Sequence, residues 1–162
     1  MTQTSYSQNP AIGVAGQVRN GRLSDAITRI VEGATVAAGL GVIGGTAEHQ
    51  AKSPVAAFTT KFLGVVRHDP TLAPADQSFA AGDQIGVVVK GVVLVAYEAD
   101  TAPTADTPAY CRHTANGAGK LTLGAFRADA DTANASVVPG GMWRRVFTAD
   151  GLAELELVGT VN

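Results

Sequence analysis

Three histidines, one cysteine and a few acidic residues are the side chains of this 162-residue chain that could do chemistry. His49, His68 and His113 are dispersed, and none has a second ligand at a spacing that would place two donors on one face. His68 precedes Asp69, a pair that could form an oriented general base, but the chain has no nucleophile in a strained strand-to-helix turn. Cys111 has no second cysteine with which to form a disulfide or a metal site. These residues predict neither a metal site nor a catalytic site.

Two further segments match ligand-binding patterns only in part. Residues 39–44 (GLGVIG) fit the G-x-G-x-x-G pattern of dinucleotide sites, but no helix is predicted after them and no acidic residue follows at the distance that would bind a ribose. Asp129, Asp131 and Asn134 resemble the start of a calcium loop, but Ala133 occupies a ligand position and the required glycine is missing. We interpret the first segment as a strand whose glycines allow a bulge or a close backbone contact, and the second as an exposed loop. No cofactor is expected, and the chain is predicted not to be an enzyme.

Composition and charge exclude several other classes of protein. Apolar residues make up 46% of the chain and charged residues 16%, which is too apolar for a disordered chain and low in charge for a freely soluble monomer. The net charge of -2 lacks the excess of positive charge on which non-specific nucleic-acid binding depends. The longest apolar run, residues 85–97, is too short to span a bilayer, and the amino terminus lacks the features of a secretory signal. We therefore expect cytoplasmic synthesis, with no membrane and no nucleic acid as a direct partner.

The elements that would position these residues are strands. Short segments rich in Val and Ile recur between Gly, Pro, Asn and Asp, whereas no window of a dozen residues has a helical repeat without Gly or Pro inside it. The predicted strands are residues 26–31, 35–43, 62–66, 84–89, 92–97, 109–112, 121–126, 136–138, 142–148 and 153–158, with a helical turn around 73–79. Polar residues alternate with apolar ones in the last strand, which favours antiparallel pairing with one wet face. The pattern predicts a single all-β domain over residues 23–162, an antiparallel β-sandwich or barrel, with exposed and mobile loops at 98–108 and 127–135.

Residues 1–22 differ from the rest of the chain. They are rich in Gln, Ser, Thr, Asn and Gly, and their apolar residues follow neither a helical nor a strand period. This composition predicts an extended N-terminal arm. Such an arm is either a frayed terminus or a segment that docks onto a neighbouring subunit, and the sequence leaves both alternatives open.

An aromatic residue and two arginines stand together near the carboxyl end. Trp143 is predicted to fill the space in the β-core, as a lone tryptophan in such a fold usually does. Arg144 and Arg145 should point to opposite faces of a strand, so at most one of them can belong to a given surface. Such an arginine can anchor an interface, or it can be a charge that blocks unwanted pairing of an edge strand.

Several segments, in order along the chain, are similar to those of one known family. They are residues 16–20 (GQVRN), Glu32-Gly33 with the strand 39–43, residues 62–66 (FLGVV), Gly82-Asp83 with 87–95, residues 138–143 (VPGGMW) and residues 151–157 (GLAELEL). They resemble segments of the structural cement, or capsid decoration, family of tailed bacteriophages. In the same order, the family's segments are the G-x-x-x-D element, the strand that follows it, the "F-x-G-I-A" segment, the central hairpin, the "I-P-G-A" element and the closing strand. Asn20 stands where the family has Asp. Their order and spacing carry the resemblance, because each segment alone is common in β-proteins.

The resemblance implies a jelly-roll-like or related β-sandwich without catalytic activity, placed on the outer capsid surface of the virion. It also implies a homodimer or homotrimer whose partner is the major capsid protein, and an arm that could add a strand to a neighbour's sheet edge. The candidate contacts to the capsid or between subunits are Tyr6, Pro10, Ile12, Val14, Arg19, Arg22 and Arg144. An alternative is a tail, baseplate or head-completion β-module of a phage virion. A sugar-binding or hydrolytic β-sandwich would need a carboxylate pair or an aromatic platform, and we can nominate neither.

Overall fold

The computed structural model describes residues 12–19, 23–55, 61–98, 100, 102–117 and 120–159, and within them the fold is built of strands. The strands are β1 (Asp25–Val31), β2 (Val36–Ala37), β3 (Gly41–Gly44), β4 (Gln50–Lys52), β5 (Phe62–Val66), β6 (Ser78–Phe79), β7 (Gln84–Ala96), β8 (Pro108–Arg112), β9 (Phe126–Arg127), β10 (Ala135–Phe147) and β11 (Leu152–Leu157). The described helical elements are two 3-10 turns, η1 (Pro74–Asp76) and η2 (Thr148–Asp150). The prediction of an all-β fold is confirmed.

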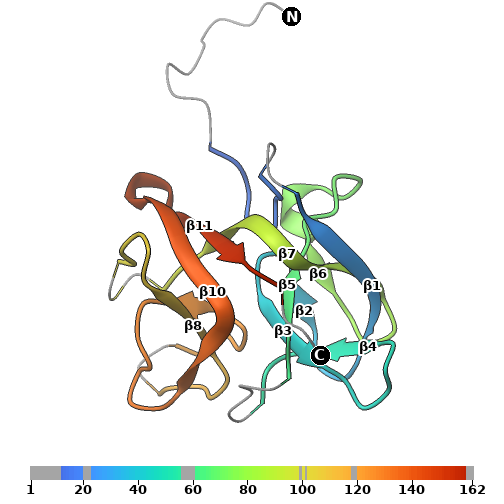
Figure 1. Cartoon of the computed structure of the whole chain (residues 1–162). Helices are drawn as coiled ribbons and strands as arrows, with labels where there is room; N and C mark the ends of the chain where they lie inside the picture. Colours follow the sequence, from blue (N-terminus) through green and yellow to red (C-terminus); the bar gives the residue numbers. More distant parts are fainter. Residues whose placement is uncertain are drawn as a thin grey trace, which may run out of the picture.

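The long strand β7 is shared by the two halves of the molecule (Figure 1). Its first part, up to Lys90, pairs with β1 and β5, and its second part, from Gly91 onward, pairs with β11. Gly91 has a φ of 115°, a backbone conformation that glycine adopts most readily, and a Cβ there would lie 2.7 Å from the Cβ of Ser24. The predicted hairpin within residues 87–95 is therefore wrong, because the chain continues through Gly91 as one strand.

In one half of the molecule five strands close into a barrel. Their hydrogen-bonded order is β1-β4-β3-β5-β7, and β1 also pairs with β7, which completes the ring. All of these pairs are antiparallel except β1 with β4, in which Ile30 lies opposite Gln50 and the strands run parallel. The sequence did not predict β4, because its three residues contain a single apolar side chain, the fully buried Ala51.

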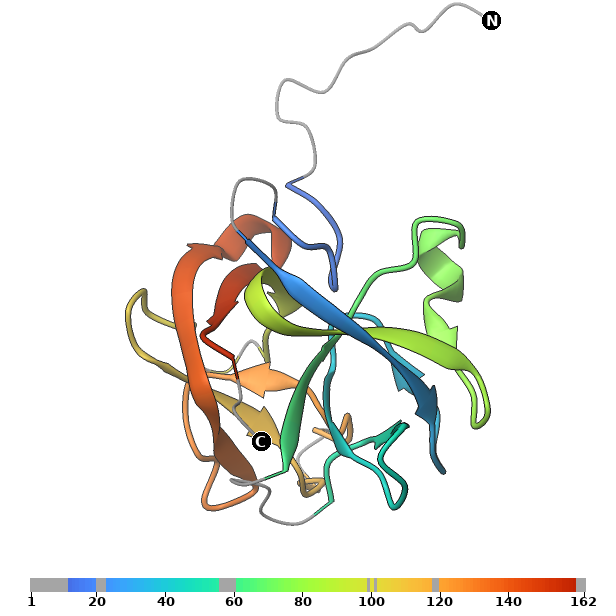
Figure 2. The same ribbon diagram turned by 45° about the vertical axis from the view of Figure 1, so that its right-hand side comes forward.

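The other half continues from β7 through β11, β10 and β8 to β9, and all of its strand pairs are antiparallel. Phe126 in β9 bridges back to Tyr97, directly after β7, and the Glu98 N–H donates to the Phe126 carbonyl at 2.9 Å. Figure 2 shows β1 crossing β7, with β10 and β11 on one side of the crossing and β3 and β4 on the other. The finer prediction of a sandwich or jelly roll is not confirmed, since the strands of the first half form a ring, which has no open edges.

The apolar residues of β5 are divided between two apolar cores. Phe62 and Val65 join the larger core, which contains the fully buried Trp143 with its ring edge against Phe126 at a centroid distance of 6.4 Å. Leu63 and Val66 join the second core. The predicted core positions of Trp143 and Cys111 are confirmed, because both side chains are completely buried.

Three predicted strand boundaries differ from the structure at positions where the backbone turns. The predicted strand 35–43 is divided into β2 and β3 by a turn that contains Gly39, which has a φ of 80°. The predicted strands 136–138 and 142–148 are joined into β10, whose pairing with β8 shifts register between Val137 and Met142. Only the last residue of the predicted strand 121–126 belongs to a strand, β9.

Candidate functional site

Residues 12–19 lie along the second part of β7 (blue in Figure 1). The Gly16 N–H donates to the Leu94 carbonyl at 2.7 Å, the Leu94 N–H donates to the Gln17 carbonyl at 2.9 Å, and the Arg19 N–H donates to the Val92 carbonyl at 2.9 Å. Because β11 pairs with the opposite side of this part of β7, the segment covers an edge that would otherwise be open. Part of the predicted arm, residues 12–19, therefore packs on the chain's own domain.

Two glycines allow this segment to approach the domain closely. A Cβ at Gly16 would lie 2.7 Å from the His68 backbone nitrogen, which instead donates a hydrogen bond to the Gly16 carbonyl at 2.9 Å. A Cβ at Gly39 would lie 2.6 Å from the Ala15 Cβ. The contact of Gly39 fits the interpretation of residues 39–44 as a segment whose glycines permit close backbone contacts.

Four of the seven predicted contact residues lie in the described part of the chain, namely Ile12, Val14, Arg19 and Arg144. The Arg19 Nε donates to the Glu154 carboxylate at 3.0 Å, and a terminal nitrogen of Arg19 donates to the Ile12 carbonyl at 3.1 Å. Arg19 thus fastens the N-terminal segment to β11. Tyr6, Pro10 and Arg22 lie outside the described residues, so their roles stay predictions.

Arg144 lies at a β-bulge in β10. Trp143 is opposite Leu155 and Arg145 is opposite Glu154, which leaves Arg144 as the extra residue between them. Arg145 lies opposite Glu154 and Arg144 binds Glu156, and these two glutamates share one face of β11. The prediction that the arginines point to opposite faces is therefore wrong, because a bulge interrupts the alternation of a strand.

The two bulge arginines already have partners within the chain. Arg144 forms ion pairs with Asp106 and Glu156, which raise its pKa through hydrogen bonds. The guanidinium carbon of Arg145 lies 4.9 Å from the centre of the Phe147 ring. A capsid contact through Arg144 would therefore have to include these acidic neighbours.

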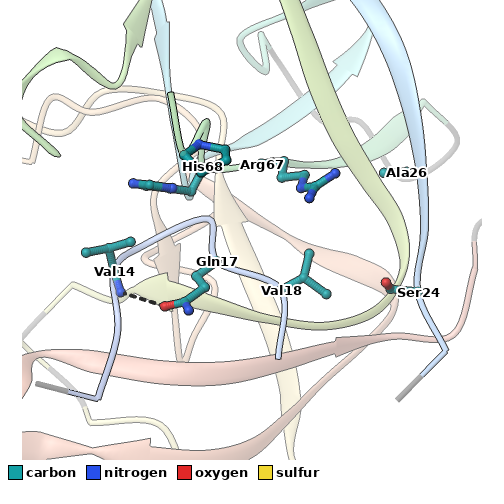
Figure 3. Close-up of a pocket in the computed structure, with 8 residues that line it drawn as sticks. Val14, Gln17, Val18, Ser24, Ala26, Arg67 and His68 are labelled. Carbon is teal, nitrogen blue, oxygen red and sulfur yellow. Dashed lines mark hydrogen bonds between the residues drawn. The ribbon is translucent and has the colours of Figure 1, made fainter. Parts of the chain in front are cut away.

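A cavity of about 480 Å³ lies between the N-terminal segment, the beginning of β1 and the residues that follow β5 (Figure 3). It is lined by Val14, Gln17, Val18, Ser24, Ala26, Arg67, His68 and Pro70. The Gln17 side-chain oxygen accepts a hydrogen bond from the Val14 N–H at 3.2 Å. Figure 3 shows the Arg67 side chain reaching toward Val18 and Ala26, while the His68 ring lies on the side of Val14 and Gln17. From the sequence, His68 was predicted only as a possible base, and Arg67 was not predicted to be a functional residue.

A second group of polar residues, built on two buried arginines, lies beneath the loops that follow β7 and β9. Arg112 is 0% exposed and donates to both oxygens of Glu98, each at 2.7 Å, and it also pairs with Asp131 at 2.8 Å. Arg127 is 3% exposed and pairs with Glu98 and Asp129, both at 2.6 Å. We call Glu98, Arg112, Arg127, Asp129 and Asp131 the buried charge cluster.

The buried charge cluster keeps its two aspartates ionised. Hydrogen bonds from Asn116 and Arg112 hold the pKa of Asp131 below its ordinary value, and a hydrogen bond from Arg127 does the same for the pKa of Asp129. Hydrogen bonds to Glu98 raise the pKa of Arg112. The predicted exposure of the loops 98–108 and 127–135 is wrong for Glu98, Arg127 and Asp131, whose side chains are 14%, 4% and 12% exposed, because the arginines draw these carboxylates inward. The Asp129 side chain remains half exposed.

The described residues contain no group of three or more His, Cys, Asp and Glu side chains placed to hold a metal ion. The single cysteine, Cys111, is buried, and this burial raises the pKa of its thiol. Within the described ranges, no helix is both long enough and apolar enough to cross a membrane.

Comparison with known proteins adds two findings. A family model described as "Structural cement protein (E217 gp24/Pam3 gp6)" matches residues 2–158. A solved chain from "The capsid of Myoviridae Phage XM1" is similar in structure, with a TM-score of 0.79 and 13% sequence identity, over 99% of this chain and 99% of that chain. At this identity the likeness shows a shared fold. No curated protein matches the chain.

Proposed function

Because this chain belongs to the phage structural cement protein family, we propose that it binds the outer surface of a phage capsid and strengthens the contacts between major capsid protein subunits. The observation that carries the proposal is the family match over residues 2–158, and the fold shared with a chain from a phage capsid supports it. The chain would act in the virion after synthesis in the host cytoplasm.

The architecture suits a protein that works through its surfaces. The ring of β1, β4, β3, β5 and β7 is closed, and residues 12–19 cover the remaining side of β7, so these strands offer few free edges for unwanted pairing. A homodimer or homotrimer that contacts several capsid subunits at once would gain from the high effective concentration of its second and third contacts. Individually modest interfaces would then hold the shell together.

The proposal is tested with capsids that lack this protein. We expect the added protein to bind them at a copy number comparable to that of the major capsid protein, and to raise the temperature at which the shells open in a dye-access assay. Binding at the few copies of a single ring would instead favour a tail, baseplate or head-completion module. Shells that bind none of the protein would contradict the proposal.

The predicted arm gives a second test within the same assay. Deleting residues 1–11 should leave the melting temperature of the free protein unchanged, because the described bonds of Gly16, Gln17 and Arg19 to β7 remain. We expect the affinity for capsids to fall about tenfold or more, the effect of losing one or two backbone hydrogen bonds to a neighbour. Unchanged affinity, measured by co-sedimentation, would identify residues 1–11 as an ordinary chain end.

A further inference from the structure

Arg67 differs from the other arginines in the described part of the chain. Arg19, Arg112, Arg127 and Arg144 each bind a carboxylate, Arg29 donates to the Thr28 carbonyl, and Arg145 lies over the Phe147 ring. The Arg67 guanidinium, by contrast, has no hydrogen bond, ion pair or ring contact with any described residue. Its positive charge is thus not neutralised by a direct contact with the described part of the domain.

The nearest acid to Arg67 in sequence, Asp69, is engaged elsewhere. The Asp69 Oδ1 accepts hydrogen bonds from the Thr71 N–H at 2.8 Å and from the Thr71 hydroxyl at 2.7 Å. These bonds lower the pKa of Asp69, and the neighbouring charges of His68 and Arg67 lower it further. Asp69 therefore stays ionised close to Arg67 without forming an ion pair with it.

The residue next to Arg67 carries a second unsatisfied group. The His68 Nε2 is buried and has no hydrogen-bond partner in the described structure, an arrangement that folded proteins rarely tolerate without a ligand or water. Arg67 and His68 both line the cavity in Figure 3.

The remaining lining of the cavity indicates which kind of anion fits. Val14, Val18, Ala26 and Pro70 are apolar, and Ser24 adds a hydroxyl. These apolar side chains suit the methylene groups of an acidic side chain. A planar guanidinium also matches the geometry of a carboxylate.

We propose that this cavity binds an aspartate or glutamate side chain of the capsid partner, with the exposed Arg67 as its counter-ion. The inference rests on the proposed capsid binding and names the part of the surface that performs it. The N-terminal segment forms one wall of the cavity through Val14, Gln17 and Val18, so the arm and the cavity would lie at the same interface.

The test compares Arg67→Gln with Lys61→Gln in quantitative binding to capsids that lack the protein. Both cations are exposed, and Lys61 lies directly before β5 whereas Arg67 lies directly after it. Each variant therefore removes one positive charge, at opposite ends of the same strand. We expect Arg67→Gln to bind about 10- to 100-fold more weakly, the effect of losing one charged hydrogen-bond partner, and Lys61→Gln to stay within about twofold of wild type. Equal affinities for the two variants, whether both unchanged or both reduced, would overturn the cavity proposal while leaving capsid binding intact.

A second arm of the test does not depend on the capsid. The free protein is titrated with sodium acetate while the Arg67 side-chain N–H resonance is followed by NMR, with sodium phosphate as the comparison for a free anion. A saturable shift with acetate supports the carboxylate site even if the wild-type protein binds no capsids, a result that would refute only the proposed function. The absence of a shift with acetate, or a stronger response to phosphate, would count against a carboxylate site.

Discussion

Replacing Arg112 with methionine is expected to lower the free energy of unfolding by about 3–5 kcal/mol, the cost of removing one partner from a buried ion pair. Arg112 is completely buried and bonds two carboxylates, those of Glu98 and Asp131. Without the guanidinium, these negative charges would remain beneath the loops, with Arg127 as the other arginine of the buried charge cluster. Denaturant unfolding followed by circular dichroism measures the loss.

Arg144→Met is the matched control for this prediction. Arg144 also contacts two carboxylates, Asp106 and Glu156, but its side chain is 37% exposed, so water can solvate the acids that it leaves behind. Its removal should therefore cost much less stability than that of Arg112, because exposed ion pairs contribute little. If both variants lost the same stability, burial would not be the reason for the importance of Arg112.

The sequence predicted the strand composition of the fold and a barrel as one of two architectures, but it did not predict the strand pairing that closes the barrel. Alternation identified β11 almost to its ends, and the buried apolar run of β5 was predicted with its exact limits. The closed ring depends on β4, whose three residues carry almost no apolar signal, and on its parallel pairing with β1. Local patterns do not report such long-range pairing, because it depends on where the rest of the chain places the strand.

The candidate site was predicted only through family resemblance and composition. The resemblance to phage structural cement proteins is confirmed, and Arg19 was identified as a contact residue, although in the structure it bonds Glu154 and Ile12 of its own chain. Arg67 and His68 adjoin in sequence, but only the fold shows that one lacks a partner and the other is partly buried. The buried charge cluster joins residues from Glu98 to Asp131, a separation that spacing rules do not cover.

The core around Trp143 supports the second large stability prediction. Trp143 is completely buried in the larger core, with its ring edge against Phe126, and it lies directly before the bulge that exposes Arg144. We expect Trp143→Ala to lower the free energy of unfolding by about 3–5 kcal/mol, the usual cost of emptying an aromatic site in a core. Circular dichroism is the appropriate probe, because Trp143 is the single tryptophan of the chain and its fluorescence is lost with it.

Trp143→Phe separates packing from polarity at this position. The Trp143 Nε1 is buried without a hydrogen-bond partner in the described structure, so the indole N–H gives the fold no polar stabilisation that phenylalanine would remove. Phenylalanine keeps an aromatic ring against Phe126 and leaves a smaller void than alanine, so its cost should be roughly half that of alanine or less. If Trp143→Phe lowered the free energy of unfolding as much as Trp143→Ala, the packed volume of the ring would not be the reason for the importance of Trp143. A hydrogen bond from its Nε1 would then hold this core together. A small cost would instead show that an aromatic ring packed against Phe126 is what the core requires at this position.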